Sequence, residues 1–186
     1  MLTDSPTRKN RAGFLESKGI KTLDLPQSGD LQEIAQRLES AMKSDKIRDV
    51  RSACTEFLVI ASDFFEVPTC GVRVLAARPL RTREHGTFEL FGDYTPDSML
   101  IRVWVRTAAR KEVTSFGTFL STLCQFCHHL DFQKFRFEGS WHTRGFCDRT
   151  ALVYHQARGT PPKKLFWVTL PGGRWRIDWQ RTNRGA

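Results

Sequence analysis

Residues 124–147 read CQFCHHLDFQKFRFEGSWHTRGFC, and this stretch holds three of the five cysteines and three of the five histidines of the chain. Residues four apart on a helix are neighbours, so Cys124 and His128 share one side, and Asp131 lies three residues further along that side. At about 100° per residue, this side is offset by about 80° from the apolar side of the same helix. The pattern predicts that Cys124 and His128 can share a metal ion that borders the core.

The apolar spacing around this stretch predicts two helices. The first runs from about 113 to 131, with an apolar stripe made of Phe116, Leu120, Leu123, Cys127 and Leu130. The second runs from His142 to about Arg158, where the sequence Gly-Thr-Pro-Pro at 159–162 is expected to stop it.

The remaining chain predicts further helices and strands from its hydrophobic period. Two N-terminal helices are expected at about 31–42 and 50–61, strands at 72–76, 87–91 and 99–106, and a β-hairpin at 165–179. The strands follow one another closely, which favours a small antiparallel three-stranded sheet, and the order of elements predicts an α+β fold. Residues 1–30 lack periodicity and are expected to form a flexible tail before a single domain at 31–186.

Composition narrows the class of protein. The 186 residues include 29 Lys and Arg against 20 Asp and Glu, a formal charge of +9, and 40% of them are hydrophobic, which argues against a disordered or collagen-like chain. No apolar run approaches the roughly 20 residues that cross a bilayer, and the N-terminus lacks the apolar segment of a secretory signal. An odd number of cysteines fits a reducing compartment, so we expect a cytoplasmic protein with no membrane partner.

The cysteines and histidines of residues 124–147 allow several interpretations. They can be small buried side chains and surface imidazoles. The pattern Cys-x-x-Cys-His also satisfies the motif of c-type haem attachment. A structural zinc site is a third interpretation, with ligands Cys124, Cys127, His142 and Cys147.

A fourth interpretation covers more of the chain, because residues 118–149 resemble the core of a zincin metallopeptidase of the SprT-like or minigluzincin kind. In that family a helix carries HExxH, often continued as HHLD, and a later His begins a pattern like H-x-x-x-F. Here HHLD at 128–131 is similar to the end of the first motif, and HTRGF at 142–146 is similar to the second. The resemblance implies a zinc ion held by Cys124, His128 and His142, with Asp131 orienting a ligand or lying at a helix end.

The chain departs from this family at the catalytic pair. Cys124 and Gln125 stand where the family has His and the general-base Glu, or a one-residue gap merges that pair into Gln125. Gln cannot accept the proton of a metal-bound water, and loss of a general base costs about 10² to 10⁴ in rate. We therefore expect a metallopeptidase-like protein that is catalytically impaired or inactive. Glu138 is a possible substitute carboxylate ligand.

Two partners are expected on different surfaces. In the resembled family an edge strand pairs with extended substrate, and the strand at 99–106 is the candidate for this role; an ordinary edge strand kept soluble by its arginines is the alternative. The second partner is nucleic acid, because residues 156–186 carry seven Lys and Arg against Asp178 alone, interleaved with aromatic residues. A hairpin at about 163–180 whose tryptophans cover the core is the competing interpretation there.

Overall fold

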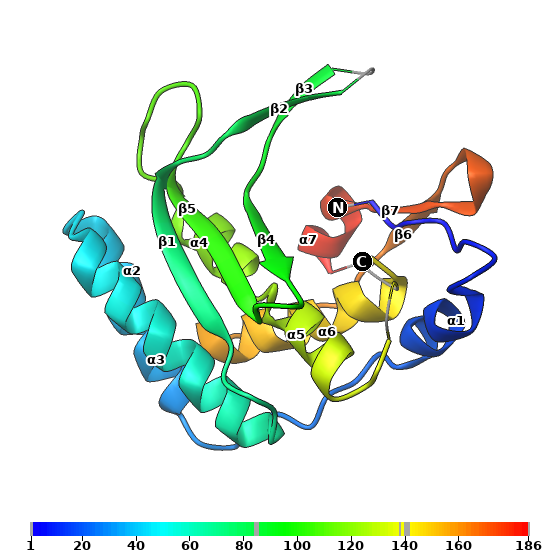
Figure 1. Ribbon diagram of the computed structural model, residues 1–186, viewed down its shortest axis with the longest axis horizontal. Coiled ribbons are helices and arrows are strands. Elements are labelled where there is room, and N and C mark those ends of the chain that lie inside the picture. The colour runs from blue at the N-terminus through cyan, green and yellow to red at the C-terminus, as the bar shows by residue number, and fades with distance from the viewer. Residues whose placement is uncertain (1, 84–85, 138, 140–141, 186) are drawn as a thin grey trace.

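The computed structural model describes residues 2–83, 86–137, 139 and 142–185. In this part of the chain the helices are α1 (Arg11–Gly19), α2 (Asp30–Lys43), α3 (Ile47–Phe65), α4 (Phe116–Leu123), α5 (Phe126–Gln133), α6 (Arg144–Arg158) and α7 (Trp179–Arg184). The strands are β1 (Gly71–Ala77), β2 (Leu80–Arg83), β3 (Gly86–Glu89), β4 (Gly92–Thr95), β5 (Leu100–Arg106), β6 (Trp167–Thr169) and β7 (Trp175–Ile177). The predicted α+β class is confirmed, as are the two N-terminal helices at α2 and α3 and the C-terminal hairpin β6–β7 (Figure 1). None of the helices in these ranges is long and apolar enough to cross a membrane.

The main sheet has the strand order β1-β5-β4 and differs from the expected meander. Strand β4, at residues where the sequence predicted no strand, is antiparallel to β5, whereas β1 is parallel to it, with Val74 opposite Val103. The reason is a separate hairpin, β2–β3, which includes most of the strand expected at 87–91 and extends away from the sheet (Figure 1). After β1 the chain forms the β2–β3 hairpin and then returns to the sheet as β4. Strand β5 lies between β1 and β4.

One face of this sheet carries the core. Ile101, Val103 and Val105 of β5 are buried, while Arg102 on the opposite face pairs with Asp93 of β4. This alternation is the one expected of a half-solvated strand. In Figure 1 the sheet lies in front of α4 and α5. The apolar faces of α2, α3, α4 and α6 share one cluster with the sheet, and its fully buried members include Leu38, Phe57, Leu58, Ile101, Leu120 and Phe146.

The helix expected at 113–131 is divided. Ser115 caps α4 through a hydrogen bond from the Thr118 amide, and α4 ends at Leu123. The amides of Cys127 and His128 then donate to the carbonyls three residues earlier, at Cys124 and Gln125. Bonds of this spacing tighten the backbone into a 3₁₀-type turn, so α5 starts afresh at Phe126. The two residues that replace the catalytic pair of the resembled family therefore lie at the junction between two helices.

The helix expected from His142 begins slightly later, as α6. The Thr143 side chain accepts a hydrogen bond from the Phe146 amide at 2.9 Å and so caps its N-terminus. Gly159, with φ of +63°, ends the helix where the Gly-Thr-Pro-Pro sequence predicted. This boundary was readable from the sequence because both signals are local.

Residues 1–30 were expected to form a flexible tail, but their described part contains ordered structure. Helix α1 buries Phe14 and Ser17 and packs against α6. The approach is close because Gly145 has no side chain: a Cβ there would lie 2.0 Å from the Ser17 carbonyl oxygen and 2.6 Å from that of Ile20. Backbone contact between α1 and α6 depends on this glycine.

We predict that Gly145→Ala destabilises the protein by about 1 to 3 kcal/mol, because the methyl group forces α1 away from α6. The helix propensity of Ala favours the substitution by about 1 kcal/mol and reduces this loss only in part. Urea unfolding measures the difference. Gly19→Ala is the matched control, since a Cβ at Gly19 meets no atom within 4 Å. Equal stability of the two variants would contradict the proposed close contact.

Candidate functional site

The structure brings His128 and His142 together. Their ring centroids lie 5.1 Å apart in a T-shaped arrangement, although the residues come from α5 and from the segment that precedes α6. Phe146 stacks on His128 with a centroid distance of 4.1 Å and also contacts the edge of His142 at 5.5 Å. His142 precedes the cap residue Thr143 and Phe146 lies in the first turn of α6, so the start of the helix brings the two rings together.

The two imidazoles have different environments. His128 is buried, and burial is the main reason that its pKa falls to about 3, with His142 as the next contribution. It is therefore neutral at physiological pH. His142 is half-buried, and its Nδ1 lies 3.2 Å from Oδ2 of Asp4. The hydrogen bond from His142 holds the pKa of Asp4 below its usual range.

The N-terminal segment Leu2–Asp4 lies against His142 and strand β7. The Thr3 amide donates to the Trp175 carbonyl at 2.8 Å, and Leu2 forms an antiparallel bridge with Arg176. The Asp4 amide donates to the His142 carbonyl at 2.9 Å, and the His142 amide returns a hydrogen bond to the Asp4 carboxylate at 3.0 Å. The segment thus extends the β6–β7 hairpin as a third extended strand, beside β7 (Figure 1).

Cys124, the third expected zinc ligand, is not grouped with the two histidines. Its side chain is fully buried, and burial raises the pKa of the thiol well above its ordinary value, which disfavours the thiolate that binds zinc. Within the described residues, no three His, Cys, Asp or Glu side chains form a group that could hold a metal ion. This finding applies to Cys124, His128 and His142, and to the alternative set Cys124, Cys127, His142 and Cys147. The donors do not fit a zinc ion as they are placed.

Gln125, expected at the position of the general base, supplies backbone at the junction between α4 and α5. Its amide donates to the Thr122 carbonyl, and its own carbonyl accepts from the His128 amide. Glu138, the possible substitute ligand, lies outside the described residues. The Gln125 side chain is not ionisable, so it cannot act as the general base that the resemblance implied at this position.

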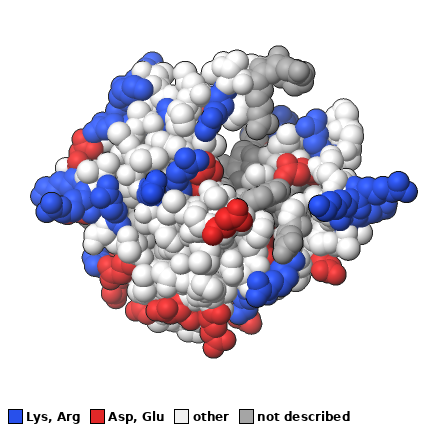
Figure 2. All heavy atoms as spheres, viewed as in Figure 1, with Lys and Arg blue, Asp and Glu red and all other residues white. Residues whose placement is uncertain are grey.

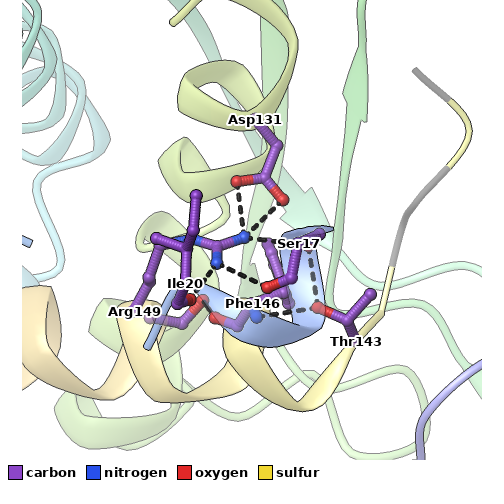
Figure 3. A network of polar contacts seen from close by, with 7 residues as sticks. Ser17, Ile20, Asp131, Thr143, Phe146 and Arg149 are labelled. Atoms are coloured by element: carbon purple, nitrogen blue, oxygen red, sulfur yellow. Dashed lines mark hydrogen bonds and ion pairs between the residues drawn. The ribbon is translucent and has the colours of Figure 1, made fainter. Parts of the chain in front are cut away.

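Asp131 has a different partner from the one expected. It lies neither against a histidine ligand nor at an exposed helix end, but forms a buried ion pair with Arg149 of α6, whose Nη2 is 2.7 Å from both carboxylate oxygens (Figure 3). The same guanidinium donates to the carbonyls of Ser17 and Ile20, at the end of α1 and just after it. Ser17 Oγ contacts Thr143 Oγ1 at 2.8 Å, so the network reaches the cap of α6. Asp131 and Arg149 join α1, α5 and α6.

His129 is a structural residue whose role was not predicted from the sequence. Its Nε2 donates to the Pro68 carbonyl at 2.7 Å, which leaves Nδ1 to accept from the Tyr94 hydroxyl at 2.9 Å. Burial lowers the pKa of His129, so this neutral form is maintained. The arrangement fixes α5 against β4, and Tyr94 also stacks near His128. The two adjacent histidines of HHLD could have indicated this structural role, because the side chains of two adjacent helical residues point away from each other.

The strand at 99–106 cannot pair with an extended peptide as expected. It forms β5, which lies between β1 and β4, so both of its edges are already hydrogen-bonded. The prediction was wrong because it placed the strand at 99–106 last in a meander, where one edge of the strand would be free. In the main sheet as described, the edge strands are β1 and β4.

The C-terminal hairpin is present, but its aromatic rings already have cationic neighbours from the same chain. Arg144 lies 4.4 Å from the ring centroid of Trp175, and Arg181 lies 4.6 Å from that of Phe166. Figure 2 shows Lys and Arg side chains at the left, upper and right margins of one face, and acidic side chains mainly along its lower margin. On this face the positive charge is distributed and does not form a single patch.

Comparisons of this chain with protein-family models, with curated proteins and with solved structures found no match. The function of the protein is therefore inferred from the residues of the site and from their geometry.

We predict that His128 makes the protein less stable as the pH falls from about 6.5 towards 3. In the unfolded chain this histidine takes up a proton near pH 6.5, whereas in the folded chain its pKa is about 3, so acid favours unfolding. In urea unfolding between pH 4 and 6, His128→Gln should show a slope shallower by about 1.4 kcal/mol per pH unit. His129 and His155, whose pKa values are lowered, and Asp131 and Asp148, whose pKa values are raised to about 6, remain in both proteins and contribute to the residual slope. Identical slopes for the variant and the original chain would refute the prediction.

Proposed function

We propose that this protein is a zincin-like, peptide-binding protein that does not hydrolyse the peptide it holds. The observation that carries the proposal is the extended segment Leu2–Asp4, which is held by backbone hydrogen bonds to Trp175 and His142. A site that holds one extended segment of this kind has the donors and acceptors to hold another. The ligand has an extended backbone and a carboxylate that faces His142, as Asp4 does.

The absence of hydrolysis follows from the residues at the α4–α5 junction. The Gln125 amide does not ionise and cannot act as a general base, and burial favours the neutral form of the neighbouring Cys124 thiol. The pair His128 and His142 supports the resemblance to a zincin, since the two motifs that carry it meet in space. The zinc ion implied by that resemblance stays a prediction, and no step of the proposed function depends on it.

Two further expectations accompany this proposal. Nucleic-acid binding near the C-terminal hairpin is supported by a basic groove that includes Lys163, Lys164 and Trp167. A cytoplasmic location is supported by the five cysteines, which are all free in the described chain.

The test uses a variant that lacks residues 2–6 and a fluorescent peptide with the sequence of residues 2–9, LTDSPTRK. In the full chain the tethered segment competes at a millimolar effective concentration, so the deletion variant should bind the peptide at least tenfold more tightly. Fluorescence anisotropy measures the affinity. Mass spectrometry of the recovered peptide should find it intact, and zinc or a chelator should leave the affinity unchanged.

Two controls keep this experiment decisive. A peptide with Asp4→Asn should bind more weakly, because it loses the charged contact with His142. The full chain with Asp4→Asn keeps the whole segment and serves if the deletion variant does not fold; it should bind the original peptide more tightly than the unmodified chain does. Absence of peptide binding in both variants would overturn the peptide-binding proposal, and chelator-sensitive cleavage would overturn the claim of inactivity.

A further inference from the structure

A groove separate from the histidine pair lies between α6 and the segment that leads into β6. Its volume is about 390 Å³, within the range of small-ligand sites. Arg144, Asp148 and Leu152 line it at intervals of four residues, so they share one side of α6. The opposite wall includes Lys163 and Lys164, which follow the end of α6.

The groove concentrates positive charge. Four cations line it, namely Lys21, Arg144, Lys163 and Lys164, against the single carboxylate of Asp148. Among the described residues, no ion pair within 4.0 Å joins any of the four to a carboxylate. Lys163 reaches only the amide oxygen of Asn183, at 3.5 Å. Asp148 interacts electrostatically with Lys21 and Arg144 and offsets one of the four charges, so the groove keeps a net positive charge.

Arg144 supplies a second, independent observation. Its Nε is buried and has no hydrogen-bond partner in the described part of the chain. Its guanidinium is also fixed in orientation, since it lies 4.4 Å from the ring centroid of Trp175. This fixed guanidinium is one of the four cations that line the groove, and a guanidinium forms charge-assisted hydrogen bonds with a phosphate.

The groove also has an apolar wall. Leu152, Leu165 and Trp167 line it, and all three are half-buried, so part of each side chain can contact a ligand. An indole ring stacks well on a nucleobase, whatever the sequence. Inorganic phosphate would contact the cations but not this apolar wall.

We propose that this groove binds a nucleotide, with its phosphate at Arg144, Lys163 and Lys164 and its base against Trp167. The phosphate can belong to a free mononucleotide or to the 5′ end of a single strand, and the chemistry of recognition is the same. The site does not involve His128 or the peptide-binding segment. A result that refutes peptide binding therefore does not refute the nucleotide site, and the reverse also holds.

The experiment titrates the full chain, at about 50 mM salt, with AMP, adenosine, inorganic phosphate and a short oligothymidine with or without a 5′ phosphate. Isothermal calorimetry should show that AMP binds more tightly than adenosine and than phosphate, because only AMP uses both walls. The double variant Lys163→Ala, Lys164→Ala should bind AMP at least tenfold more weakly. A preference for the 5′-phosphorylated strand over AMP identifies a strand end as the source, and the reverse preference identifies a free nucleotide.

The matched control is Lys43→Ala, Lys46→Ala, which removes the same charge from the exposed end of α2 and the start of α3. It should bind AMP as the unmodified chain does. Equal weakening in the two double variants would show a general charge effect and would overturn the site. Absence of AMP binding and of oligonucleotide binding would overturn it as well.

Discussion

The ion pair between Asp131 and Arg149 is the interaction on which the rest of the structure depends. Both side chains are almost fully removed from solvent, and the desolvation penalty for each ion is several kcal/mol. The burial raises the pKa of Asp131 to about 6, although Arg149 opposes this rise. The pair is tolerated because Arg149 also donates to the carbonyls of Ser17 and Ile20, so its charge is distributed among α1, α5 and the loop that follows α1.

This constraint positions the candidate site. His128 lies one turn before Asp131 on α5, and His142 immediately precedes the cap of α6, the helix that carries Arg149. Because the ion pair fixes α5 against α6, it also fixes the two imidazoles against each other. Arg149 also anchors α1. The segment that precedes α1 lies at the β6–β7 hairpin, where Asp4 contacts His142. A charge pair away from the site therefore sets the geometry of the site.

The sequence was informative wherever the signal was local. Apolar spacing predicted α2 and α3, and the Gly-Pro signal after Arg158 marked the end of α6. The parallel pairing of β1 with β5 was missed because strand order depends on the long-range path of the β2–β3 excursion. Helix α1 was missed because contacts with Gly145 and Arg149 stabilise it, more than 120 residues away, and its own apolar periodicity is weak. For the site, the spacing of HHLD and HTRGF indicated His128 and His142, but the buried environment of Cys124 could not be read from its neighbours.

Backbone hydrogen bonds hold the extended segment Leu2–Asp4 against His142 and β7, and the proposed peptide site depends on this contact. Hydrogen exchange of individual backbone amides, followed by NMR at neutral pH, tests it most directly. The account predicts that the amides of Thr3, Asp4 and His142 exchange much more slowly than in an unfolded chain, because each donates a hydrogen bond in the folded protein. Exchange of the Thr3 and Asp4 amides at the rate of an unfolded peptide, while the amides of α6 remain protected, would contradict it.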